Sequence, residues 1–186
     1  MKTQYYTATT LDGFIATLDH SLEWLFPLGD IADTGYDAFF ADVGALAMGS
    51  ATYEWLIANH LRPGTEEEKP WPYESPVWVF SNRSFSFPEG ADINTANGDV
   101  RPVHEAMKKA ADGKNIWIVG GGDLAGQFYD AELLDEMIVT VGSTTLGRGM
   151  PLFPRETPPG RLKLQDARPM GTGFAELRYE IDYGAV

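Results

Sequence analysis

The sequence contains no cysteine, and its three histidines lie far apart. The absence of cysteine excludes disulfide bonds, thiol nucleophiles and thiolate metal ligands. His20, His60 and His104 do not have the spacing that metal-binding histidines show. We therefore expect no bound metal.

Basic residues are also few. The chain has 14 Lys and Arg against 27 Asp and Glu, which gives a formal net charge of -13 at pH 7. Such a charge repels a nucleic-acid backbone, so we expect no nucleic-acid partner. A small phosphorylated ligand is still compatible, because a helix N-terminus and a few cations can hold it locally.

Long hydrophobic runs are missing as well. No stretch approaches the roughly 20 apolar residues of a membrane span, and residues 1–10 lack the pattern of a signal peptide. We expect a cytoplasmic protein with no membrane contact. The 186 residues, of which 44% are hydrophobic, are enough for one core, so the expected organisation is a single domain, 1–186.

Apolar patterns predict alternating strands and helices along most of the chain. The expected strands are residues 2–9 with 14–16 after a kink, 45–48, 77–80, 92–95, 116–119 and 136–141. The expected helices are 33–43 closed by Gly44, a second running to about residue 60 with Ser50 or Thr52 as its cap, 102–111, and one through 124–129. Residues 62–76 and 142–160 are expected loops, and 162–169 and 174–183 an antiparallel hairpin.

This order predicts an α/β fold with three layers. Alternating β and α units favour a mostly parallel, twisted sheet that helices cover on both faces. The terminal hairpin adds an antiparallel edge.

The segment from Ile116 to Ala125 is a buried strand that runs into three glycines and then a helix. Glycines let a ligand approach the backbone, and the helix start directs free N–H groups toward an anion. A pyrophosphate fits such a turn, although the spacing is not the G-x-G-x-x-G of a Rossmann turn. Three glycines can also simply make a tight connection between strand and helix.

A second junction, from Leu46 to Glu54, has the same construction around Gly49. In an open parallel sheet, ligands bind at the carboxyl ends of the strands, which is where both turns must lie. Two such turns can contact two parts of one extended ligand.

The order of five short segments resembles the dihydrofolate reductase-like proteins. Within them it is most similar to the reductase domain of bacterial riboflavin biosynthesis, the RibD C-terminal domain, over nearly the whole chain. The segments are LDGFIA from Leu11, MGxxTYE from Met48, FSNR from Phe80, VGGG from Val119 and LGxGxPLF from Leu146. No single segment is specific, whereas their sequence of occurrence is.

The resemblance implies a sheet of about eight strands that binds NADPH across the strand ends. By the family pattern, Ala8 and Ile15 border the nicotinamide, and a cis peptide is expected at Gly120-Gly121. The other implied cofactor residues are Gly49, Ser50, Ala51, Thr52, Ser81, Asn82 and Arg83 on the adenosine side, and Val119, Gly120, Gly121, Gly122, Asp123, Leu124 and Ala125 at the pyrophosphate.

One departure concerns the 2'-phosphate of NADPH. Many relatives carry a basic residue directly after the glycine of the Met-Gly turn, where this chain has Ser50. The expected preference for NADPH over NADH therefore depends on Arg83, whose fork suits a phosphate. The alternative is that Arg83 is an exposed loop residue.

The proton donor is the least defined part of the site. In dihydrofolate reductases it is a carboxylate at the first long helix, and Asp33 and Asp37 flank that position here. Asp12, at the kink of the first strand, is a third candidate. The alternative is that each of the three is a cap or turn residue, which is the more common role of aspartate at such positions.

Four residues are candidates for the substrate pocket: Trp24, Tyr36, Phe40 and Arg148. The aromatic rings can line a pocket for a planar ring or cover the edge of the core. Arg148 can meet a substrate phosphate or remain solvated.

We expect an NADPH-dependent reductase of a small pterin, folate or aminopyrimidine substrate, similar to dihydrofolate reductase or 5-amino-6-(5-phosphoribosylamino)uracil reductase. The alternative is a nucleotide-binding sensor or carrier that has the same fold but no reductase activity. Relatives of the riboflavin branch often pair through sheet edges, so a homodimer is also expected.

Overall fold

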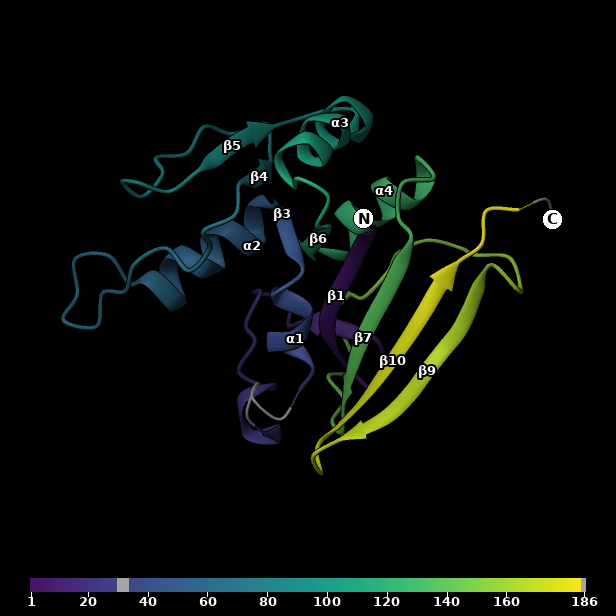
Figure 1. Cartoon of the computed structure of the whole chain (residues 1–186). Coiled ribbons are helices and arrows are strands. Elements are labelled where there is room, and N and C mark those ends of the chain that lie inside the picture. Colours follow the sequence, from purple (N-terminus) through teal and green to yellow (C-terminus); the bar gives the residue numbers. More distant parts are fainter. Residues whose placement is uncertain (30–33, 185–186) are drawn as a thin grey trace.

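The computed structural model describes residues 1–29 and 34–184 and contains one large twisted sheet (Figure 1). Its eight strands lie in the order β5-β4-β3-β6-β1-β7-β10-β9. Their bounds are β1 Thr3–Thr10, β3 Val43–Gly49, β4 Val77–Phe80, β5 Ile93–Ala96, β6 Asn115–Gly120, β7 Glu136–Gly142, β9 Leu162–Met170 and β10 Phe174–Ile181. A separate two-stranded sheet pairs β2 Phe14–Ala16 with β8 Met150–Pro151.

The sheet is parallel from β5 to β7 and antiparallel beyond it. Strand β1 pairs in parallel with β6 and β7, β3 with β4 and β6, and β4 with β5. Strands β10 and β9 complete the sheet as an antiparallel hairpin. The predicted fold class, a mostly parallel eight-stranded α/β sheet with a C-terminal hairpin, is confirmed.

Helices lie on both faces of this sheet. Helices α3 Val100–Ala110 and α4 Gly122–Asp130 cover one face, and α1 Tyr36–Phe40 and α2 Ser50–Trp55 cover the other. Helix α2 continues as a π-helical turn, Leu56–Leu61, and a short 3-10 turn spans Phe26–Leu28.

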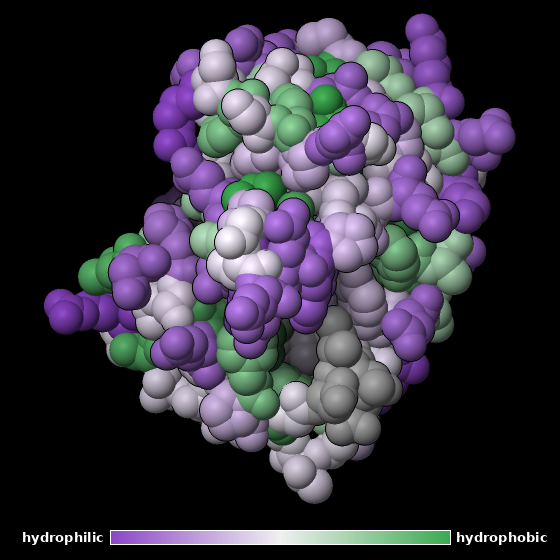
Figure 2. Space-filling view, turned by 90° about the vertical axis from the view of Figure 1, so that its left-hand side faces the viewer, coloured by the Kyte–Doolittle hydropathy of each residue, from purple (hydrophilic) through white to green (hydrophobic). Residues whose placement is uncertain are grey.

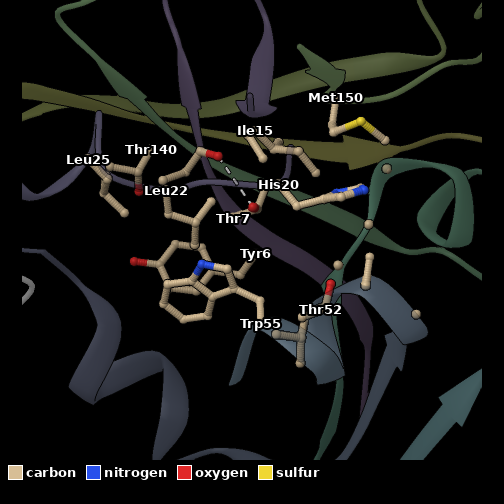
Figure 3. A pocket seen from close by; sticks show the side chains of 18 of the residues that line it. Tyr6, Thr7, Ile15, His20, Leu22, Leu25, Thr52, Trp55, Thr140 and Met150 are labelled. Carbon is tan, nitrogen blue, oxygen red and sulfur yellow. Dashed lines mark hydrogen bonds between the residues drawn. The ribbon is translucent and has the colours of Figure 1, made fainter. Parts of the chain in front are cut away.

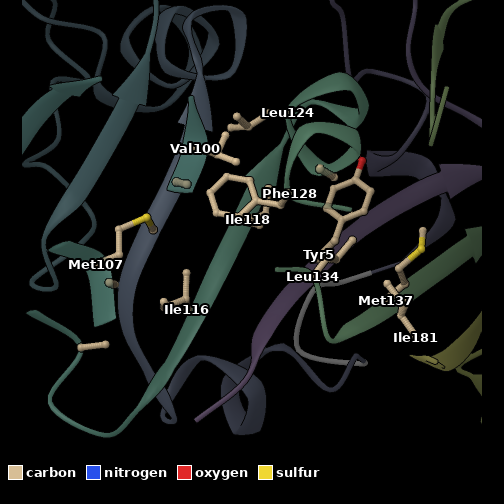
Figure 4. Packing of buried hydrophobic residues seen from close by; sticks show 14 of the residues in the cluster. Tyr5, Val100, Met107, Ile116, Ile118, Leu124, Phe128, Leu134, Met137 and Ile181 are labelled. Atoms are coloured by element: carbon tan, nitrogen blue, oxygen red, sulfur yellow. The ribbon is translucent and has the colours of Figure 1, made fainter. Parts of the chain in front are cut away.

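Each face buries its own hydrophobic cluster. Under α3 and α4, Met107 and Phe128 pack against Ile116 and Ile118 of β6 with no side-chain exposure (Figure 4). On the opposite face, Tyr53 of α2 belongs to a cluster that includes Leu46, Val79 and Trp117. Full burial of one such side chain contributes about 1.5–3 kcal/mol, so the two clusters hold the strand ends in fixed positions.

The first helix was predicted to span residues 33–43, and its predicted C-terminal end was too late in the sequence. Helix α1 ends at Phe40, and Val43 and Gly44 belong to β3. A Cβ on Gly44 would lie only 2.4 Å from the carbonyl oxygen of Ala111, so this glycine lets β3 pass close to the end of α3. Its role is close backbone approach within a strand rather than helix termination.

The expected cap of α2 was also wrong. The helix begins after Gly49, and neither Ser50 nor Thr52 makes a side-chain capping bond. Helix α3 begins two residues earlier than predicted, because the carboxylate of Asp99 accepts a hydrogen bond from the backbone N–H of Arg101. None of the described helices has the length and apolar character needed to cross a membrane.

Candidate functional site

The two glycine junctions lie side by side. Strands β3 and β6 are neighbours in the sheet, and Met48 pairs with Gly120 at their carboxyl ends. A Cβ placed on Gly49 would lie 3.8 Å from the backbone nitrogen of Gly121, and the Gly120-Gly121 peptide is cis. Gly49 and Gly120 are 71 residues apart in the sequence, yet their two junctions form one continuous backbone surface.

A pocket of about 910 Å³ opens over this surface (Figure 3). On the face that carries α2, Figure 2 shows hydrophobic residues next to a hollow in a largely hydrophilic surface. The pocket volume lies within the range of small-molecule sites. The predicted residues that line it are Ala8, Ile15, Tyr36, Gly49, Ala51, Thr52, Val119, Gly120, Gly121, Gly122 and Asp123.

The other predicted ligand residues do not line this pocket. Leu124 and Ala125 are buried in the core, and the N–H of Ala125 already donates to the carbonyl of Gly121. The lining of the pocket also does not include Ser50, Ser81, Asn82, Trp24 and Phe40. Arg148 is exposed in the loop between β7 and β8.

Arg83 is exposed and already paired. Its two terminal nitrogens donate to the two carboxylate oxygens of Glu54 at 2.8 and 2.9 Å, and its guanidinium lies over the ring of Phe85. The pairing raises the pKa of Arg83 further above its usual value.

The start of α4 is built to accept an anion. Gly121 precedes the helix without a side-chain cap, so the first N–H groups of α4 have no capping side chain. Asp123 brings a negative charge here, but its carboxylate accepts hydrogen bonds from Gln127 at 2.9 Å and from Arg155 at 3.0 Å. These contacts, the one from Gln127 first, lower the pKa of Asp123. Arg155, which the sequence did not single out, partly neutralises the helix start.

Of the three carboxylates predicted as proton donors, two are described and neither lines the pocket. Asp12 accepts hydrogen bonds from the hydroxyl of Thr10 at 2.6 Å and from the backbone N–H of Gly147 at 2.7 Å, and these lower its pKa. It therefore ties the turn after β1 to the 146–147 loop. Asp37 is exposed in the first turn of α1, and Asp33 lies outside the described residues.

Part of the pocket lining is aromatic and carries hydroxyl groups; the sequence predicted Tyr36 there but not the other three residues. Tyr6, Tyr73 and Trp117 line the pocket together with Tyr36. Burial raises the pKa of Tyr6 and Tyr73, and raises that of Tyr36 to about 12. At pH 7 these phenols are neutral hydrogen-bonding groups beside flat apolar walls.

Thr140 of β7 adds a further hydroxyl group that the sequence did not predict. It pairs with Ala8 across the sheet and lies at the end of the pocket away from Met150 and Thr52 (Figure 3). Its hydroxyl is near enough to the Tyr6 phenol to lower the pKa of that group, yet among the described residues it has no hydrogen-bond partner of acceptable geometry. The sequence signal that could have identified Thr140 was a polar residue within a largely apolar strand, on the side that faces the pocket.

A smaller hollow of about 340 Å³ adjoins the pocket. His20, Leu22, Phe26 and Trp55 line both spaces, so the two lie next to each other. The lining of the smaller hollow is mostly polar, whereas that of the larger pocket is mostly apolar. The described residues contain no cluster of side chains suited to a metal ion.

The fold and the glycine-lined pocket at the carboxyl ends of the strands define a protein of the dihydrofolate reductase-like class. A model of the RibD C-terminal domain matches residues 2–175, and the chain belongs to that family. Bacillus subtilis has two similar proteins. The uncharacterized protein YwjB is 33% identical over 96% of this chain and 97% of its own length, and YyaP is 27% identical over 92% and 90%.

Solved structures show the same architecture. A Shewanella sp. PV-4 protein named for riboflavin biosynthesis has 26% identity and a TM-score of 0.80, with 98% of this chain and 99% of that chain covered. Dihydrofolate reductase from Enterococcus faecalis, in a complex with NADP(H), has 16% identity and a TM-score of 0.63 over 97% and 96%. The latter likeness concerns the fold alone.

Proposed function

We propose that the protein is an NADPH-dependent reductase that transfers hydride to a small heterocycle of the pterin, folate or aminopyrimidine type. The observation that carries the proposal is the meeting of Gly49 with Gly120, Gly121 and Gly122 along one wall of the pocket. Exposed backbone at two adjacent strand ends is what an elongated dinucleotide requires.

The glycine-lined wall fits the phosphates of such a cofactor. A Cβ on Gly121 would meet only the Cδ1 of Ile15, at 4.0 Å, so protein packing does not demand a glycine there. The bare backbone instead leaves space inside the pocket beside the uncapped start of α4. A pyrophosphate group occupies this kind of position because N–H groups and the helix dipole both favour negative charge.

The chain's own residues then have distinct roles. Bound NADPH supplies a hydride. Ala8 and Ile15 border the nicotinamide end, and the aromatic rings of Tyr36 and Trp117 exclude water and provide flat surfaces for a second ring. Arg155 partly offsets the negative charge of Asp123 at the phosphate position through its ion pair.

The similar proteins support this proposal. The matching family is a domain of riboflavin biosynthesis proteins, and a Thermotoga maritima structure of the same fold is named as a deaminase and 5-amino-6-(5-phosphoribosylamino)uracil reductase. The alternative, a nucleotide-binding protein without reductase activity, is favoured by one observation, that neither Asp12 nor Asp37 lines the pocket.

A fluorescence titration tests the binding step. Trp55 and Trp117 line the pocket, so bound NADPH should quench protein fluorescence in a saturable way. N-acetyltryptophanamide at matched absorbance controls for optical filtering by NADPH. The absence of saturable quenching up to millimolar NADPH would refute the proposal.

Turnover separates the reductase from the alternative. Purified protein is incubated with NADPH and a panel of pterins, folates and aminouracils, and the absorbance at the NADPH band is followed. A decrease that depends on both protein and substrate supports the reductase. Saturable binding with no consumption across the panel would favour a carrier or sensor.

We also propose a homodimer. Strand β9 forms an edge of the sheet, and most of its residues are exposed. An uncovered edge strand offers unpaired backbone groups to a second chain. Light scattering at micromolar concentration should give twice the monomer mass of 20.5 kDa, and a monomer mass would contradict this proposal.

A further inference from the structure

The order of the strands sets the direction of an extended ligand. Ala8 lies on β1, Gly120 ends β6 and is followed by Gly121 and Gly122, and Gly49 ends β3. These three strands are consecutive in the sheet. The next strand is β4, whose last residue, Phe80, pairs with Gly49. A dinucleotide with its nicotinamide at β1 therefore has its adenosine end at the step between β3 and β4.

Glu54 and Arg83 meet at that step. Glu54 lies on α2, directly after the Gly49 turn, and Arg83 follows β4. Both carboxylate oxygens of Glu54 accept hydrogen bonds from Arg83, at 2.8 and 2.9 Å, which is the fork geometry that Arg otherwise offers to a phosphate. The guanidinium also lies 5.3 Å from the centre of the Phe85 ring.

The pair carries no net charge. A ligand phosphate at this step lies near both Arg83 and the carboxylate of Glu54, which already accepts both hydrogen bonds of the guanidinium. The attraction of the phosphate by Arg83 is therefore offset by its repulsion from Glu54. Both side chains are about half exposed, so solvent weakens the ion pair between them. The negative charge of Glu54 nevertheless remains at the step between β3 and β4.

The surrounding residues do not replace the missing positive charge. Ser50, at the start of α2, is neutral. Arg101, in the first turn of α3 on the opposite face of the sheet from α2, lies 3.3 Å from the carboxylate of Asp99. The overall charge of -13 also disfavours a doubly charged phosphate here.

We propose that Glu54 is a specificity-determining residue that cancels the attraction of Arg83 for a 2'-phosphate, so that the protein accepts NADH about as well as NADPH. This inference depends on the proposed binding of a nicotinamide dinucleotide. The ribose 2'-hydroxyl of NADH suits the step, because a hydroxyl donates to a carboxylate without charge repulsion.

The test measures dissociation constants of NADH and NADPH by tryptophan fluorescence for the wild type, Glu54→Ala and Arg83→Ala. The same titrations use 5'-AMP and adenosine 2',5'-bisphosphate, which report on the adenosine end alone. Glu105→Ala is the matched control, since it removes an exposed carboxylate that pairs with Lys108 on α3 and changes the net charge by the same amount.

For the wild type we expect NADPH and NADH affinities within about threefold of each other. Glu54→Ala frees Arg83 and should favour NADPH by about tenfold or more, mainly through tighter NADPH binding. Arg83→Ala, which leaves Glu54 uncompensated, should favour NADH, and Glu105→Ala should keep the wild-type ratio.

Two results would overturn the inference. One is a wild-type preference for NADPH of tenfold or more, and the other is an unchanged ratio in Glu54→Ala. If the wild type binds neither dinucleotide, the proposed function fails and this inference fails with it. If the wild type binds both dinucleotides saturably but prefers NADPH by tenfold or more, only the role of Glu54 is refuted and the proposed function stands.

Discussion

Gly121 and Gly122 are adjacent, yet a methyl group added to each should have opposite consequences. At Gly122, a Cβ would lie 2.3 Å from the carbonyl oxygen of Leu152, well inside the ordinary contact range of 3.4–4 Å. That oxygen accepts a hydrogen bond from the Tyr5 hydroxyl at 3.0 Å, and the N–H of Leu152 donates to Gly13 at 2.9 Å. The 152 segment is therefore held from two sides and cannot easily move away.

Gly122→Ala should consequently destabilise the fold. Overpacking of this kind costs about 1–3 kcal/mol, which for a chain of this size lowers the unfolding temperature by roughly 2–12 °C. Thermal unfolding followed by circular dichroism measures the shift.

Gly121→Ala should leave the fold intact and weaken cofactor binding. Its backbone is extended, with φ at -86°, which alanine adopts readily. Apart from the two adjacent residues of the chain, the nearest atom to a new Cβ is the Cδ1 of Ile15 at 4.0 Å. The unfolding temperature should be unchanged or slightly higher, because alanine restricts the unfolded chain. The methyl group occupies the space assigned to the pyrophosphate, so NADPH affinity should fall by about tenfold or more, or at least about 1.4 kcal/mol.

The contrast between the two variants makes the reasoning refutable. Wild-type NADPH affinity in a folded Gly121→Ala protein would mean that the phosphates do not approach this backbone. An unchanged unfolding temperature for Gly122→Ala would mean that the 152 segment is not packed as described. Neither result can be attributed to general instability, because stability and binding are measured on both proteins.

Three further variants test other parts of the structure. Thr140→Val removes a buried hydroxyl that lacks a hydrogen-bond partner among the described residues, so it should preserve or raise the unfolding temperature. The same variant should bind aminouracil or pterin ligands more weakly. Unchanged ligand binding would mean that Thr140 does not contact the substrate ring. Burial lowers the pKa of His104, so the folded state resists its protonation, and stability should fall as the pH drops below about 6.5. His104→Gln should flatten that decline in unfolding temperature between pH 8 and 5, and an identical decline would assign it to other groups. Leu134→Ala, at a fully buried position, should lower the urea-measured free energy of unfolding by about 2–5 kcal/mol, against about 0.5 kcal/mol or less for the exposed Leu164→Ala; equal losses would contradict the described core.

Much of the fold is encoded locally. The strands from Val77 to Phe80 and around Ile116 were predictable because short apolar runs bounded by glycine or proline have few other stable conformations. The same holds for the antiparallel hairpin around Gly171. Where prediction failed, as at Gly44, a contact with a residue far along the chain decided the conformation.

The sequence by itself also determined the chemical character of the site. Gly49 and the triplet from Gly120 mark exposed backbone at strand ends, whatever the strand order. The absence of cysteine and the low number of cations predict that neither a metal nor a nucleic acid binds.

Only the tertiary structure decided which groups face one another. The pairing of β3 with β6 brings Gly49 next to Gly120, 71 positions further along the chain. The pairing of β1 with β7 places Thr140 beside Ala8. Glu54 reaches Arg83, and Asp12 bonds to Gly147, across loops of differing length. Hydrogen bonds and ion pairs form over about 3 Å, so their partners depend on chain packing that no local pattern encodes.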